Sequence, residues 1–187
     1  MDLTLIRHCQ AGDTGAFAAL FEKYKNLVFR TAYLALGNRL DAEDILQEVF
    51  IHVYRCLGSY DPKRGAFTTW LYRITVNRCL NFRRRRSFFT LALDELPESE
   101  LKEAFLSENQ QVEAESTQHA LMHLSMKLRV VIVLRFFWDL SNAEIAEILD
   151  LPLGTVKSRL NLALKSLCRD LKDNFSSSTI SIPEVPE

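Results

Sequence analysis

The spacing of apolar residues constrains the fold of this chain most, because apolar side chains recur every three or four positions along most of it. A second stripe of this kind follows the first, and no convincing pattern of strand-like alternation interrupts the series. The first stripe, between Thr14 and Leu36, consists of Phe17, Leu20, Phe21, Tyr24, Val28 and Tyr33. The second consists of Ile45, Leu46, Val49, Phe50, Val53 and Leu57. The sequence therefore predicts an all-α fold.

Polar residues, glycine and proline mark where these helices begin and end. Gly37 is expected to end the first helix, and Asp41 to cap the second. The segment "GSYDPKRG" reads as a loop, and a third helix is expected from about Ala66 to the arginines Arg83–Arg86. We expect these four arginines to follow the helix, cap its C-terminal end and attract phosphate groups.

The C-terminal third shows a more specific pattern. Ser141 and Glu144 form a capping box that opens a helix over Ala143–Leu149, and Pro152 suits the first turn of another helix after a short break. This order predicts a helix-turn-helix, with a purely structural helical hairpin as the alternative. The residues of the second helix expected to face inward are Val156, Leu160, Ala163, Leu164 and Leu167. The opposite face has Lys157, Ser158, Asn161 and Lys165.

Charge is distributed unevenly along the 187 residues. Counting Lys and Arg against Asp and Glu gives +6 for residues 1–86, −7 for 87–126 and +3 for 127–172. Two basic modules separated by an acidic segment suit two nucleic-acid-binding domains, although helical surfaces can also simply differ in charge. We predict domains over 1–88 and 117–173, joined by an acidic flexible linker over 89–116, with a disordered tail over 174–187.

Several classes of function are not expected. The longest apolar stretches are far below the roughly 18 residues that span a bilayer, and no signal peptide is evident, so a cytoplasmic protein is expected. The four cysteines are scattered, and His119 and His123 lack a third ligand at suitable spacing, so we expect no metal site. No nucleophile–base pair, phosphate loop or carboxylate constellation is present, so we expect no enzyme, cofactor or small-molecule substrate.

Three stretches together resemble the extracytoplasmic-function (ECF) sigma factors of bacterial RNA polymerase, in the order and spacing of that family. "DAEDILQEVF" resembles the helix that binds the core polymerase, and "FTTWLYRITVNRCLNFRRRR" the helix that recognises and melts the promoter. "LSNAEIAEILDLPLGTVKSRL" resembles the family's helix-turn-helix. The resemblance implies a region 2 helical bundle and a region 4 helix-turn-helix domain. The implied partners are core RNA polymerase, promoter DNA, and an anti-sigma factor in a soluble or membrane-bound form.

The resemblance also implies roles for individual residues. The expected polymerase-binding residues are Asp41, Asp44, Gln47 and Glu48. Those expected at the downstream promoter element are Tyr60, Lys63, Arg64, Ala66, Phe67, Arg73, Asn77, Asn81 and Arg84. Those expected at the upstream element are Thr155, Lys157, Ser158, Arg159, Asn161 and Lys165. Asn77 is the strongest candidate for base reading, because residues 73, 77, 81 and 84 are spaced to share one helical stripe.

Leu162 and Leu164 depart from the family pattern, which commonly has cations in this stretch. Each lost phosphate contact removes about one unit from the slope of the logarithm of the DNA-binding constant against the logarithm of the salt concentration. The alternative function is a helix-turn-helix regulator that is not a polymerase subunit. Such a regulator would have no use for "DAEDILQEVF" and the helix that follows it.

Overall fold

The computed structural model describes residues 2–90 and 118–176, and these residues contain helices and turns but no strand. The N-terminal helices are α1 (Asp2–Gln10), α2 (Thr14–Leu36), α3 (Arg39–Cys56) and α4 (Phe67–Thr90), with short 3-10 turns η1 (Leu57–Ser59) and η2 (Pro62–Arg64) between α3 and α4. The C-terminal part contains a helical segment over 118–123, then α6 (Met126–Ile132), the π-helical turn η3 (Val133–Phe137), α7 (Asn142–Leu149) and α8 (Leu153–Ser176). The all-α prediction is confirmed. Most of the predicted linker and the end of the predicted tail lie outside the described residues.

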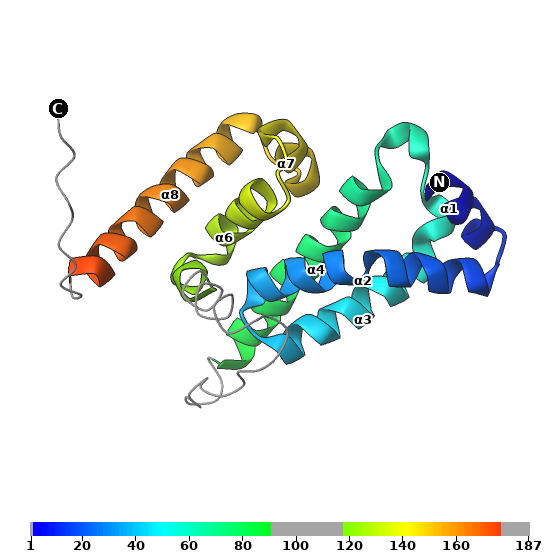
Figure 1. Ribbon diagram of the computed structural model, residues 1–187, viewed down its shortest axis with the longest axis horizontal. Helices are drawn as coiled ribbons and strands as arrows, with labels where there is room; N and C mark the ends of the chain where they lie inside the picture. Colours follow the sequence, from blue (N-terminus) through cyan, green and yellow to red (C-terminus); the bar gives the residue numbers. More distant parts are fainter. Residues whose placement is uncertain (1, 91–117, 177–187) are drawn as a thin grey trace, which may run out of the picture.

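Helices α2, α3 and α4 pack against one another, and α1 covers the start of α2 (Figure 1). The α2 helix begins where the Asp13 carboxylate accepts a hydrogen bond from the Ala16 N–H. It ends at Gly37, as predicted from the sequence, and Gly37 adopts the left-handed conformation (φ +80°). The fully buried side chains at the centre of this bundle include Leu20, Val28, Ile45, Val49, Val53 and Leu71.

Three local expectations about the N-terminal domain were wrong or incomplete. Asn38, not Asp41, caps α3, since its side-chain oxygen accepts a hydrogen bond from the Asp41 N–H. The arginines Arg83–Arg86 lie inside α4, which continues to Thr90, so they do not follow and cap the helix. The short helix α1 was not predicted, and its core contact is made by Ile6.

The C-terminal domain follows the predicted helix-turn-helix closely. Both hydrogen bonds of the Ser141–Glu144 capping box are present, and Asp150 ends α7 in the left-handed conformation (φ +53°). The α8 helix packs against α6 and α7 through buried Val156, Leu160 and Ala163. Leu164 was expected to face inward, but its side chain is 40% exposed.

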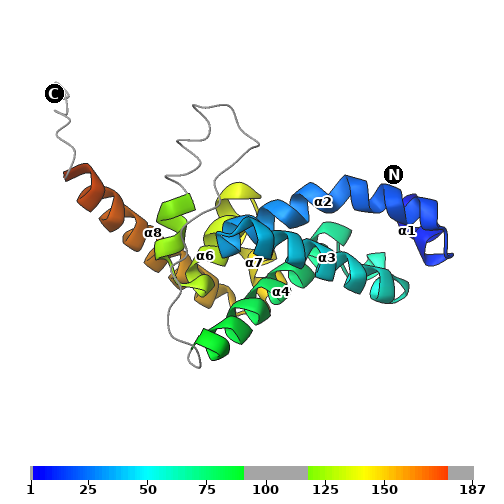
Figure 2. The ribbon, with the colours of Figure 1, turned by 90° about the horizontal axis from the view of Figure 1, so that it is seen from below.

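The two domains pack directly against each other, with α6 and α7 between α8 and the N-terminal bundle (Figures 1 and 2). Buried Arg129 of α6 donates a hydrogen bond from Nη1 to the Ala35 carbonyl of α2 at 2.6 Å. Gln118 Nε2 donates to the Tyr33 carbonyl of the same helix at 3.1 Å. Side chains of the C-terminal domain thus donate hydrogen bonds to backbone carbonyls in the last turn of α2. None of the helices described is long and apolar enough to cross a membrane.

Candidate nucleic-acid interface

The loop between α3 and α4 is held in a defined shape by its own side chains. Asp61 accepts a hydrogen bond from the Lys63 N–H at 2.9 Å, which opens the turn at Pro62. The Tyr60 hydroxyl donates to the Gly65 carbonyl at 3.0 Å, and this hydrogen bond links the two ends of the loop. Gly65 has φ +149°, a conformation that side chains with a Cβ rarely adopt. The loop predicted to read DNA is therefore fixed in shape before any ligand arrives.

A second support comes from α1 and from an aromatic cluster under the loop. Gln10 Nε2 donates to the carbonyls of Leu57 and Tyr60, so α1 holds the start of the loop. Tyr60 and Phe67 are buried, and their rings contact each other and Trp70 with centroids 5.4–5.6 Å apart. Burial raises the pKa of Tyr60, so its hydroxyl stays protonated and can donate. In this conformation Phe67 supports the loop from within the core.

An open pocket joins this loop to the exposed stripe of α4. Arg73, Asn77 and Asn81 are exposed, and all three line it. Tyr60, Arg64 and Ala66 line it from the loop. Six of the nine residues predicted for the downstream element thus meet at one place. Lys63 and Arg84 are exposed but lie outside the lining, as does buried Phe67.

The pocket also contains residues that sequence reasoning did not place there. His52 of α3 and Arg78 of α4 both line it, and Arg78 Nη2 lies 3.1 Å from His52 Nδ1. Arg78 directly follows Asn77 in a helix rich in arginine and asparagine, so the sequence partly indicated that Arg78 would lie near the pocket. His52 could not be found in this way, because it lies 25 residues earlier on another helix.

The C-terminal domain reaches the same pocket. The α7 helix packs on α4, and Glu147 is part of the pocket lining. The Trp138 ring, just before α7, lies against buried Tyr72 of α4 with centroids 5.6 Å apart. Within the described chain, the Trp138 Nε1 and Gln118 Oε1 atoms are buried without a hydrogen-bond partner. Each such atom costs about 1–3 kcal/mol, so the contact between the domains is not optimal.

The outward face of α3 forms a separate surface. Among the predicted polymerase-binding residues, Asp44 and Gln47 are exposed, whereas Asp41 and Glu48 are half-buried. Sequence reasoning missed three exposed apolar side chains on this helix: Leu40 (56% exposed), Ile51 (52%) and Tyr54 (63%). Residues 40, 44, 47, 51 and 54 are spaced alternately by four and three, which places them in one stripe along the helix. We call these five residues the α3 stripe.

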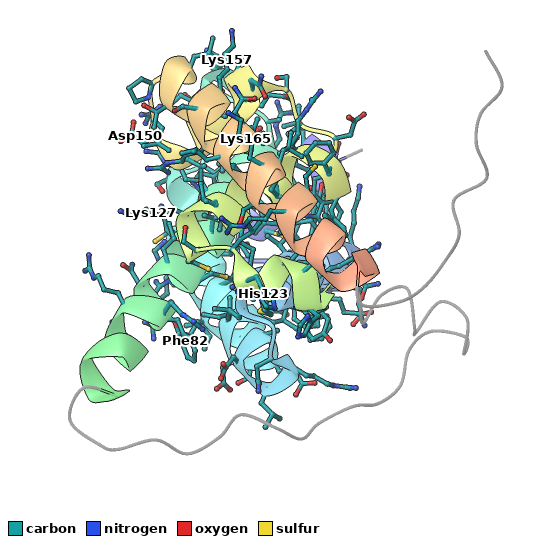
Figure 3. The ribbon with its side chains drawn as sticks, turned by 90° about the vertical axis from the view of Figure 1, so that its left-hand side faces the viewer. Phe82, His123, Lys127, Asp150, Lys157 and Lys165 are labelled. Atoms are coloured by element: carbon teal, nitrogen blue, oxygen red, sulfur yellow. The ribbon has the colours of Figure 1, made fainter. Side chains whose placement is uncertain are left out.

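The outward face of α8 has the predicted polar residues. Lys157, Ser158, Asn161 and Lys165 are exposed, and Figure 3 shows Lys157 near the start of the helix and Lys165 further along it. Thr155 and Arg159 are half-buried. Leu162 is 58% exposed on the same helix, so an apolar group is available to a partner there.

The described residues contain no group of three or more His, Cys, Asp or Glu side chains that could hold a metal ion. The His119 and His123 rings contact each other with centroids 4.7 Å apart, without a third ligand in this part of the structure. The pocket and the faces of α3 and α8 thus offer hydrogen-bond donors, cations and aromatic rings to a partner.

Comparison with known proteins identifies the family. The Sigma-70 region 2 model matches residues 20–89, and the Sigma-70 region 4 model matches residues 114–167. The ECF RNA polymerase sigma factor SigW of Bacillus subtilis is 35% identical over 179 residues, covering 90% of this chain and 95% of SigW. The ECF RNA polymerase sigma-E factor of Escherichia coli K12 is 38% identical over 181 residues, covering 89% of this chain and 92% of that protein.

Two solved structures share the fold. CnrH, solved in complex with the cytosolic domain of CnrY, superposes with a TM-score of 0.67 at 23% identity, covering 91% of this chain and 96% of CnrH. RpoE from Bartonella quintana, solved with the anti-sigma factor NepR, gives a TM-score of 0.71 at 22% identity, covering 83% of this chain and 96% of that chain. The family models and the sequence relatives together show that this chain belongs to the ECF sigma factors of the sigma-70 family, which are non-enzymatic subunits of RNA polymerase.

Proposed function

We propose that this sigma factor acts in the cytoplasm, where it directs core RNA polymerase to specific promoters and helps to open the DNA. The pocket between α3, α4 and their loop is the observation that supports this most. It combines the amides of Asn77 and Asn81, which can read base edges, with the cations Arg64 and Arg73, which can hold phosphate. Trp70 lines it as well and offers a surface on which an unstacked base can rest.

The α3 stripe is proposed as the polymerase-binding face. Its spacing suits a partner helix laid along it, and the family uses the corresponding surface to bind the coiled-coil helices of the largest polymerase subunit. The exposed apolar groups would then be buried on binding, and Asp44 and Gln47 would set register and association rate. This assignment keeps Asp44 and Gln47 of the four polar residues expected from the sequence and adds Leu40, Ile51 and Tyr54.

The exposed face of α8 is proposed to bind the upstream promoter element in the major groove, with Lys157 and Lys165 at phosphates and Asn161 at base edges. An anti-sigma factor is proposed as a further partner. Support for it comes from the structural neighbour RpoE, which was solved with the anti-sigma factor NepR. Exposed Leu162 offers an apolar contact to such a protein.

Reconstitution tests the function directly. The purified full chain is mixed with bacterial core polymerase and a library of promoter fragments, and run-off transcripts are sequenced. We expect a subset of fragments with a shared two-part motif to give transcripts that core enzyme alone does not give. If no complex with core enzyme forms while the protein still binds duplex DNA, the chain acts as a regulator outside the polymerase.

We further propose that the domains separate when promoter DNA binds. Glu147 lines the downstream pocket from α7, so a nucleotide entering there would meet both a neighbouring helix and an anionic side chain. The buried, unpartnered Trp138 and Gln118 atoms would regain hydrogen bonds to water on opening, which lowers its cost.

Energy transfer between two dyes can follow this separation. Dyes placed by noncanonical amino acids at Glu22 and Lys127, which are exposed and outside the proposed sites, report the distance between the domains. We expect transfer efficiency to fall when core polymerase and promoter DNA are added. A pair at Ala11 and Arg30, both exposed in the N-terminal domain and outside the proposed sites, should show little change. Equal efficiencies before and after promoter binding would show that the domains stay together.

A further inference from the structure

His52 lines the proposed downstream pocket, but the proposed function gives it no role there. It is half-buried on α3, outside the exposed α3 stripe, and it lines the downstream pocket opposite the α4 residues Asn77 and Arg78. No role follows for it from the polymerase-binding function of α3. Its imidazole shares the pocket with the guanidinium groups of Arg64, Arg73 and Arg78.

The contacts of His52 determine which ring nitrogen has the proton. Arg78 Nη2 lies 3.1 Å from His52 Nδ1, and a guanidinium group has only donors, so Nδ1 accepts. Arg78 Nη1 also lies 3.6 Å from Glu48 Oε2, which holds the guanidinium between a carboxylate and the imidazole. The Cys56 thiol is a further neighbour, with Sγ 3.9 Å from Nδ1. The proton of the neutral ring is therefore on Nε2.

The charge state follows from the same surroundings. Burial lowers the pKa of His52, and the positive charges of Arg78 and Arg55 lower it further, so the ring is neutral at pH 7. A neutral ring with Nδ1 occupied as an acceptor has one remaining donor, Nε2–H. Arginine attracts any phosphate through its charge, whereas an uncharged donor gains only from a correctly placed acceptor, such as those on base edges.

We propose that His52 is a specificity-determining residue for the downstream element. In this assignment, which rests on the proposed function, His52 Nε2–H donates to a ring nitrogen or carbonyl oxygen on the edge of an unpaired base. Arg78 is then a positioning residue, because it fixes the tautomer that makes His52 a donor.

Two substitutions separate base reading from support of Arg78. The amide of His52→Gln reaches the place of Nε2 and keeps a donor there, but it loses the acceptor close to the backbone. The shorter amide of His52→Asn puts an oxygen near the place of Nδ1, so it keeps the acceptor for Arg78 and loses the far donor. The two variants therefore each retain one half of the imidazole's hydrogen bonding.

The assay uses full-length protein with core polymerase on promoters randomised across the downstream element, and it compares initiation rates base by base. We expect His52→Asn to lose about tenfold discrimination at one position, as for the loss of one base-reading hydrogen bond, and His52→Gln to stay within about twofold of wild type. The reverse pattern would show that His52 only holds Arg78, and wild-type discrimination in both variants would show that it has no role in reading. Failure of the wild-type protein to give promoter-specific transcripts would instead overturn the proposed function itself.

A second measurement does not depend on the folding of any variant. The nitrogen chemical shifts of the His52 ring in the free full-length protein distinguish the two neutral tautomers. We expect the Nε2–H form. A ring protonated on Nδ1 would remove the donor and overturn the proposal.

Discussion

Replacing Ile51 with glutamate is expected to weaken binding to core polymerase about 100-fold, which corresponds to about 2.7 kcal/mol. Ile51 is 52% exposed in the α3 stripe, between Gln47 and Tyr54. A carboxylate there would be buried against the partner helix without a counter-charge, and an unpaired buried charge is strongly unfavourable. Competition with labelled wild-type protein for core polymerase measures the change.

Leu3→Glu is the matched control for this substitution. Leu3 is also an exposed apolar residue, at 47%, but it lies on α1 outside the α3 stripe. It should bind core polymerase like the wild type, and both variants should unfold at nearly the wild-type temperature because neither residue is in the core. If Ile51→Glu bound as tightly as Leu3→Glu, the polymerase-binding face would have to be elsewhere.

The fold was predictable where a local rule acts alone. The helix over Thr14–Leu36, its end at Gly37 and the capping box at Ser141 each depend on residues a few positions apart, and all three are present. The rules failed where two local signals competed, since Asn38 caps α3 although Asp41 has an equally suitable side chain. The four arginines were misplaced for a related reason, because a cluster of cations is favourable near a helix end but does not end a helix.

The pocket was predictable only along α4 and its loop. Asn77 and Asn81 share a stripe that follows from helical spacing, and both line the pocket. His52 and Glu147 enter it from α3 and α7, and no spacing rule connects them to α4. The exposed apolar residues of α3 were missed because a stripe of Ile45, Val49 and Val53 already accounted for the helix's apolar character.

The junction of the two domains depends on one buried guanidinium group. Arg129 is 2% exposed and donates to four carbonyls, those of Leu121, Ala35, Met122 and Leu124, at 2.6–3.0 Å. Burial lowers the pKa of Arg129 to about 10, with a smaller contribution from Arg83, so the side chain remains charged at pH 7. Its cation lies at the C-terminal end of α2, where the helix dipole favours positive charge.

Arg129→Met is therefore expected to lower the free energy of unfolding by roughly 3–5 kcal/mol, because a hydrogen bond to a charged group contributes about 1.5–3 kcal/mol and water can replace only some of the four. The melting temperature should fall by roughly 6–20 °C, measured by circular dichroism at 222 nm.

Lys127→Met is the matched control, because it removes a cation from the exposed side of the same helix and should change stability by less than about 0.5 kcal/mol. Arg129→Lys keeps the charge but has three donors for four carbonyls, so it should fall between wild type and Arg129→Met. Equal stability of Arg129→Met and Lys127→Met would mean that water alone satisfies these carbonyls and that the guanidinium does not hold the junction together.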